Sequence, residues 1–296
     1  MRRAGTALGA GLLAAAVAAA AGCTGELDDR SDVRDLRVLA IQATPPELVL
    51  NDEVLPDVAL TALVADPRDP ARTIDYAWQA CGLTDDLRCA SADFALDLGA
   101  GSASLAAVGA VMPVTDELVA AARELDTYLG FGGVSIVAEL VLAAGSDEEL
   151  HAIKQVPAVY SLPRDTTANR NPTPPALRHD DVDWPEDEVL EVAAGTEVKV
   201  EPVSPTGDAE AYSVLRFDLD HEELQEYLEY DFFATAGPWN RSSSGGPPEV
   251  VSTETTLASR WTAPDEAPDE DVTLWVVVRD GRGGTAWTTR RVHVTQ

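Results

Sequence analysis

The chain has 296 residues, of which 51 are acidic and 21 basic, so its formal net charge is −30. A surface this acidic repels nucleic-acid phosphates and anionic lipid head groups, which argues against both as direct partners. Beyond the N-terminal segment, roughly 260 residues remain, a length that suits two domains of ordinary size.

The N-terminal segment has the pattern of a cleaved export signal. Two arginines precede an almost wholly apolar run, residues 7–21, which is shorter than the about 20 residues that a membrane-spanning helix needs. The run ends in residues 20–23 (AAGC), which resemble the lipobox of bacterial lipoproteins, although Ala20 stands where that family usually has Leu. The resemblance implies that Cys23 is diacylated and becomes the first residue of the mature protein.

Cys23 is therefore expected to attach the protein to a membrane through lipid. The alternative is an ordinary secretory signal that happens to end near a cysteine. If the sorting habit of the family carries over, Thr24 after the cysteine favours the outer membrane. Residues 23–35 are polar and acidic and are expected to form a tether.

The other two cysteines, Cys81 and Cys89, stand close together in CGLTDDLRC. A disulfide can close this spacing in an oxidising compartment. The alternative is a metal site, which needs two further sulfur or imidazole ligands, and the neighbouring sequence offers none.

Strand signals dominate the first half of the chain. Residues 37–43 alternate between apolar and polar types, and 58–67 form a β-rich run that ends at proline. In 74–82, Tyr76 and Trp78 lie two residues apart and therefore on one face of a strand. A hairpin is expected from two later segments, 134–145 and 150–160.

One short helix is expected between these strands, in TDELVAAARELDTYL. Four apolar residues recur there at helical spacing behind a Thr115 cap, namely Leu118, Ala122, Leu125 and Leu129.

The second half repeats this plan. Residues 196–205 match the rhythm and closing proline of 58–67, the aromatic strand 229–237 echoes 75–82, and 272–294 form a closing hairpin. Two copies of one plan predict a mainly β fold with two immunoglobulin-like antiparallel β-sandwiches in tandem and one short helix inserted in the first.

This repeat sets the expected domain boundaries. A proline-rich and charged stretch between the two copies is the expected linker. The segments are a lipoprotein signal peptide at 1–22, an acidic tether at 23–35, the first sandwich at 36–163, the linker at 164–188 and the second sandwich at 189–296.

The strand pattern resembles bacterial immunoglobulin-like modules. The whole arrangement, from RVLAIQATPPEL through FFATAG to RWTAP and LWVVVRDGRGGTAW, resembles uncharacterised surface lipoproteins of myxobacteria-like organisms. The resemblance implies a surface lipoprotein without an assigned activity. The inter-sheet disulfide of antibody domains is not expected, because Cys81 and Cys89 are too close in sequence to join two sheets.

Motifs of enzyme chemistry are weak. RDGRGGTAW has a GxGxxA frame, but the strand-like residues 285–294 follow it where a dinucleotide site needs a helix, so a hairpin turn is expected. The four histidines form neither HExxH nor HxH, and GxSxG is absent. No catalytic residue or cofactor is predicted. An envelope hydrolase with an unrecognised acidic site stays as the alternative, since residues far apart in sequence also converge in enzymes.

Calcium is the one metal that the sequence suggests. Residues 218–229 place acids at alternating positions, as a calcium loop does, but Glu223 stands where such a loop needs Gly. The weak candidate ligands are Asp218, Asp220, Glu222 and Glu229. A second acidic cluster lies in the linker, at Asp180, Asp181, Asp183, Glu186, Asp187 and Glu188. The competing interpretation of both clusters is solvated acid, and the linker would then be a self-repelling hinge.

A long Ser/Gly/Pro-rich loop at 236–252 carries Trp239 and Arg241. These residue types are common at binding hot spots, so the two form a possible binding loop. The alternative is a mobile loop with Trp239 packed against the end of the sandwich. The sequence thus favours a non-catalytic binding, adhesion or spacer module whose partner is an envelope protein or polysaccharide.

Overall fold

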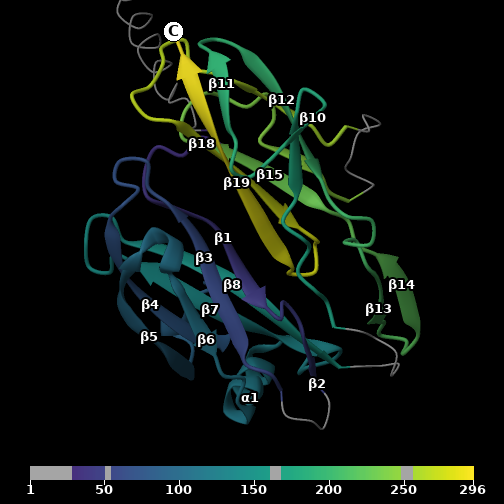
Figure 1. The fold of residues 1–296 in the computed structure, drawn as a ribbon. Coiled ribbons are helices and arrows are strands. Elements are labelled where there is room, and N and C mark those ends of the chain that lie inside the picture. Colours follow the sequence, from purple (N-terminus) through teal and green to yellow (C-terminus); the bar gives the residue numbers. More distant parts are fainter. Residues whose placement is uncertain (1–28, 51–54, 161–167, 248–255) are drawn as a thin grey trace, which may run out of the picture.

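The protein consists of two β-sandwiches stacked on each other (Figure 1). The structure is a computed structural model and describes residues 29–50, 55–160, 168–247 and 256–296. The fold is mainly β, as the sequence predicted.

The first sandwich has a five-stranded and a three-stranded sheet. The five-stranded sheet has the order β2 (Leu48–Leu50), β8 (Leu150–Tyr160), β7 (Gly133–Leu142), β4 (Thr73–Gly82), β5 (Ala95–Ser104). The facing sheet has the order β1 (Arg37–Thr44), β3 (Val58–Ala65), β6 (Gly109–Met112). Short 3-10 helices lie at Cys89–Ser91 and Leu105–Ala107. Trp78 is fully buried between the sheets, and Tyr76 packs against the same core, as their spacing predicted.

The expected helix is α1 (Asp116–Leu125), which packs on β4 and β7. Thr115 caps it by accepting a hydrogen bond from the Leu118 N–H at 3.2 Å. The helix ends at Leu125 because the Asp126 carboxylate accepts the N–H groups of residues 128 and 130 and forms a turn. The predicted apolar stripe is therefore too long by one turn, and Leu129 is 78% exposed.

The second sandwich also has a five-stranded sheet and a smaller partner. The larger sheet has the order β11 (Val189–Ala193), β19 (Thr285–Thr295), β18 (Val272–Arg279), β15 (Glu229–Ala234), β16 (Ser243–Gly245). The facing sheet has the order β10 (Val182–Trp184), β9 (Ala176–His179), β12 (Glu197–Val203), β17 (Ser259–Thr262). A separate hairpin is formed by β13 (Ala211–Leu215) and β14 (His221–Gln225).

The two larger sheets share one strand order. Each begins with a short edge strand (β2 or β11), which is followed by the closing hairpin of its half (β8–β7 or β19–β18). The aromatic strand (β4 or β15) and the next strand along the chain (β5 or β16) complete the sheet. This is the arrangement of an immunoglobulin-type sandwich. The edge strands β2 and β11 pair parallel with β8 and β19, so the sheets are not antiparallel throughout.

The boundary before the second sandwich differs from the expected one. Strands β9 and β10 fall within 164–188, the expected linker, yet they belong to the second sandwich. Trp184 is 2% exposed in its core, and Arg290 donates two hydrogen bonds to the Trp184 carbonyl. Burial of this indole outweighs the repulsion between the nearby acids.

The outer face of the β15–β18–β19 sheet packs against β1 and β3 of the first sandwich (Figure 1). An apolar cluster forms the middle of this contact. Its members are Val33, Leu39, Ala40, Leu63, Ala65, Phe233, Trp275, Val277 and Trp287. We call this contact the seam. Because both faces of β18 are covered, its sequence LWVVV is apolar without alternation.

The described part of the expected tether, residues 29–35, does not extend away from the fold. It lies along the second sandwich, where Val33 N–H donates to the Ala234 carbonyl and Ala234 N–H donates to the Ser31 carbonyl. Arg30 also pairs with buried Asp231. The chain therefore contacts the second sandwich before it begins the first.

Candidate functional site

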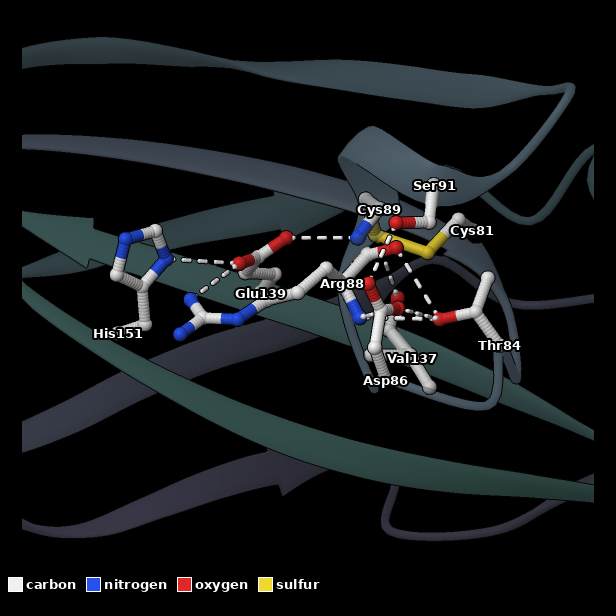
Figure 2. Close-up of a disulfide and its surroundings, with 9 residues drawn as sticks. All are labelled: Cys81, Thr84, Asp86, Arg88, Cys89, Ser91, Val137, Glu139 and His151. Atoms are coloured by element: carbon white, nitrogen blue, oxygen red, sulfur yellow. Dashed lines mark hydrogen bonds and ion pairs between the residues drawn. A yellow bond between two sulfur atoms is a disulfide. The ribbon is translucent and has the colours of Figure 1, made fainter.

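The cysteine pair forms a disulfide near the end of β4, in the five-stranded sheet of the first sandwich (Figure 2). Cys81 is the last residue but one of β4, and Cys89 begins the short 3-10 helix that follows. The bridge therefore closes a local loop and does not join the two sheets. Both residues are buried against Val137. The bridge leaves no free thiol at this position.

A buried carboxylate lies beside the disulfide (Figure 2). Glu139 accepts hydrogen bonds from the Cys89 N–H at 2.8 Å and from Arg88 at 3.0 Å, and it contacts His151 Nδ1 at 2.9 Å. Burial alone would raise the pKa of Glu139, but the bonds from His151, Cys89 and Arg88 outweigh it and lower that pKa. The cluster holds a buried charge on the outer face of the five-stranded sheet, opposite the inter-sheet core.

This cluster bears on the hydrolase alternative. His151 has its second ring nitrogen 2.9 Å from Glu149, so carboxylates occupy both nitrogens and neither faces a nucleophile. General acid or base work needs a ring nitrogen within reach of the reacting proton. The cluster is therefore built to orient and stabilise.

The calcium candidates do not come together. Asp218 and Asp220 lie in the exposed turn between β13 and β14, Glu222 lies on β14, and Glu229 begins β15. In the linker cluster, Asp181 pairs with Lys199 at 2.6 Å and Asp183 with Arg178 at 2.8 Å. Within the described ranges, no three histidine, cysteine or acidic side chains form a possible metal site.

The proposed binding loop is corrected at its central residue. Trp239 is only 5% exposed and packs on Phe232 with ring centroids 5.0 Å apart. It also pairs with Trp261 through an isolated β-bridge. Core packing explains this tryptophan better than recognition does. Arg241 is half-buried, and residues 248–252 of the loop lie outside the described residues.

A buried ionic cluster crosses the seam. Arg282, in the turn between β18 and β19, reaches Glu47 of the first sandwich at 2.6 Å and Glu226 at 2.8 Å. Its guanidinium also lies 4.3 Å from the centre of the Tyr212 ring. Burial raises the pKa of Glu226, opposed by the Glu210 N–H and by Arg282. A paired buried arginine of this kind fixes how the two sandwiches meet.

Lys154 makes a second crossing contact. Its ammonium group donates to the Gly283 carbonyl and to Thr285 Oγ1, the latter at 3.1 Å. Burial lowers the pKa of Lys154 to about 8, and nearby Asp280 partly opposes that shift. The lysine comes from β8 of the first sandwich and its acceptors from the closing hairpin of the second.

Two asparagines of the expected linker complete the crossing contacts. Asn169 is 2% exposed; its N–H donates to Glu47 at 2.7 Å and its side-chain amide to Asp280 at 2.9 Å. Asn171 donates to the Ala43 carbonyl at 2.7 Å and accepts from the Thr285 N–H at 2.9 Å. This part of the linker is therefore bound at the seam and does not act as a free hinge.

A pocket of about 540 Å³ opens at the seam, beside the apolar cluster. The first sandwich contributes residues 61–67, Pro70 and residues 105–106, and the second contributes residues from Thr235 to Thr289. Trp275 and Trp287 belong both to the pocket wall and to the seam cluster. The volume lies in the range of small-molecule sites, which often occur where domains meet.

An exposed aromatic cluster is a second apolar feature. Phe217, 70% exposed in the β13–β14 turn, has its ring centroid 5.1 Å from those of Tyr128 and Phe131 in the segment after α1. It shares no residue with the pocket. Nothing around it specifies what covers it, so it remains a surface without an assigned ligand.

Sequence reasoning missed the seam residues. Glu47 and Arg282 are 235 positions apart, so no local spacing connects them. The one available signal was the unbroken apolar run LWVVV, which is typical of a strand buried on both faces.

No family model and no curated protein matches the chain. Within the described ranges, no helix has the length and apolarity that a membrane crossing requires.

Solved structures with immunoglobulin-like domains align with most of the chain at low identity. Murine CEACAM1b is 9% identical, with 88% of this chain and 100% of that one covered, at a TM-score of 0.23. The two tandem V-type regions of VCBP3, a v-region-containing chitin binding protein, are 12% identical, with 87% and 100% covered, at a TM-score of 0.26.

A nucleoside hydrolase-related hypothetical protein from Saccharophagus degradans, associated with carbohydrate metabolism, aligns with 44% of this chain. The identity is 14%, the TM-score is 0.27, and only 27% of that protein is covered. At such TM-scores none of these likenesses supports a conclusion about function. The immunoglobulin-like description rests on the strand order itself.

Proposed function

We propose that this protein is an exported, lipid-anchored binding module of the bacterial cell envelope, attached through Cys23 and binding its ligand in the seam pocket. The pocket carries the proposal, because both sandwiches build its wall. Buried ionic and apolar contacts on both sides of the seam hold the wall in one shape, and a preformed site loses less ordering free energy on binding.

The lipid anchor rests on the sequence. The AAGC box and the resemblance to surface lipoproteins of myxobacteria-like organisms support it, and Thr24 supports the outer membrane. Asp29 is the first described residue, and the backbone from Cys23 to Asp29 spans at most about 20 Å. Lipid on Cys23 would therefore keep the second sandwich close to the membrane surface.

The hydrolase and calcium alternatives have less support. The histidine cluster beside the disulfide has no nitrogen available for catalysis, and the candidate calcium ligands are separated. Two carboxylates of the pocket, Asp66 and Asp271, are already ion-paired with Arg72 and with His293 and Arg291, which suits a protein that binds and does not convert its ligand.

The mass of the native N-terminal peptide tests the anchor. A diacylglycerol on Cys23, together with release of a Cys23→Ala variant from the membrane fraction, is the expected result. An unmodified N-terminus on a protein that fractionates without membrane would overturn the lipid anchor. Thr24→Ser is the matched control, since it leaves the cysteine in place and should stay with the membrane.

A further inference from the structure

We infer that the seam pocket binds a neutral sugar. This inference rests on the proposed binding function and names its ligand class. The pocket combines aromatic walls with hydroxyl groups and acidic acceptors, and it has no basic side chain among the described residues that line it.

The aromatic wall is formed by Trp275 and Trp287, which project from the outer face of β18 and β19. Trp275 is 9% exposed and Trp287 is half-buried. Neither indole N–H donates a hydrogen bond to another described residue, although neither is sealed from solvent. Each tryptophan therefore offers an apolar ring and an available donor. A sugar ring, with an apolar C–H face and a hydroxyl edge, matches both.

Hydroxyl and carboxylate groups surround this wall. Thr61, Thr273 and Thr289 line the pocket with hydroxyls that make no hydrogen bond to other described side chains. Asp66 is 3% exposed, and its Oδ2 accepts no hydrogen bond within the described residues, although it is ion-paired with Arg72 at 3.0 Å. That oxygen is sealed from solvent, so Asp66 contributes negative charge to the pocket wall and no direct contact to a ligand.

Charge decides between a sugar and an ionic ligand. With no lysine, arginine or histidine among the described lining residues, an anion would find no cationic group in the pocket wall. Of the three acidic residues that line the pocket, Asp66 and Asp271 are already ion-paired, which leaves a cation only the exposed carboxylate of Glu270. Asp66 faces Arg72, and Asp271 lies 3.0 Å from His293 and 3.8 Å from Arg291. A neutral, hydroxyl-rich ligand fits the tryptophan rings and threonine hydroxyls of the pocket wall.

The test titrates neutral hexasaccharides into the full chain and follows heat and tryptophan fluorescence. Maltohexaose, cellohexaose and chitohexaose are the probes; hexagalacturonate is the anionic probe and spermidine the cationic one. The chain is held in a polyoxyethylene detergent, which carries neither sugar nor charge and so does not compete. Trp287→Ala removes one wall, and Thr289→Val removes a hydroxyl at nearly constant volume. Phe217→Ala, an exposed aromatic outside the pocket, is the matched control.

We expect at least one neutral hexasaccharide to bind with a submillimolar Kd, and Trp287→Ala to weaken it about tenfold or more. Thr289→Val should weaken it by a smaller factor, and Phe217→Ala should bind as the unaltered chain does. The inference would be overturned if none of the three neutral hexasaccharides bound. It would also be overturned if both pocket variants were folded and bound the sugar as tightly as the unaltered chain. If spermidine binds and Trp287→Ala abolishes that binding, the pocket is a binding site but its ligand is a cation, and the sugar assignment is overturned. The lipid test on Cys23 is independent of all these outcomes.

Discussion

Two of the buried clusters of acids and arginine differ in how they are assembled. Glu139 contacts Arg88 and His151 within the first sandwich, beside a disulfide whose cysteines are eight positions apart in the sequence. Arg282 meets Glu47 and Glu226 across the seam. The first cluster stabilises one sandwich, whereas the second defines how two sandwiches lie against each other. The difference shows that an arginine–carboxylate pair stabilises one sandwich when its partners belong to that sandwich, and joins two sandwiches when its partners come from both.

Removing the arginine of the seam should have the largest effect. Arg282→Ala leaves Glu47 and Glu226 buried without a cation, and we expect it to lower the free energy of unfolding by about 3–5 kcal/mol. Equilibrium denaturation followed by fluorescence measures this loss. Arg260→Ala is the control, since its ion pair with Glu197 is half exposed and should contribute about 1 kcal/mol or less. Equal losses in the two variants would contradict a special role for the seam.

Lys154 gives the seam a pH dependence. The pKa of Lys154 is about 8 in the folded protein and 10.5 ordinarily, so between these values the unfolded chain binds more protons. Stability from this residue should therefore rise with pH across that window, by roughly 3 kcal/mol. The measurement is the difference in unfolding free energy between the unaltered chain and Lys154→Met, from neutral pH to about pH 11. A difference that stays constant or falls would show that the ammonium is not desolvated.

The disulfide should stabilise the first sandwich without affecting the seam. Replacing Cys81 and Cys89 together by Ala frees a short loop in the unfolded chain, which costs roughly 2–3 kcal/mol. Amide exchange should rise in β4 and β7 and stay unchanged in β18 and β19. Increased exchange in both sandwiches would mean that the local cluster also supports the seam.

Arg88→Ala should have the smallest effect and is the direct counterpart of Arg282→Ala. The Arg88 side chain is 40% exposed, and Glu139 keeps its bonds from the Cys89 N–H and from His151. We expect a loss of about 1 kcal/mol or less by equilibrium denaturation. A loss as large as that of Arg282→Ala would remove the distinction between the two clusters.

Local features of the fold were predictable from the sequence, and contacts between distant segments were not. The hairpins, the aromatic strands and the Thr115 cap depend on residues a few positions apart, and they are present. Spacing in sequence could not predict that Asn169 would be buried at the seam. Residue type was equally misleading for Trp239, because a tryptophan in a Gly/Pro-rich loop looks the same whether it packs inward or faces a partner.

The acidic residues show why charge patterns were ambiguous. Asp218 and Asp220 alternate as calcium ligands do, yet they lie in the turn of an exposed hairpin. Asp181 and Asp183 lie in the expected linker, but Asp181 pairs with Lys199 on β12 and Asp183 pairs with Arg178 on β9. Which cation faces an acid depends on strand pairing, and periodicity alone does not specify it.

Amide hydrogen exchange at the seam tests the central claim most directly, namely that the two sandwiches form one unit around the pocket. The N–H groups of Asn169 and Thr285 donate to Glu47 and to Asn171, so their protection reports the seam itself. We predict protection close to that of the β18 core amides. Exchange as fast as that of an exposed loop would show that the sandwiches separate freely, and the pocket between them would lose its basis.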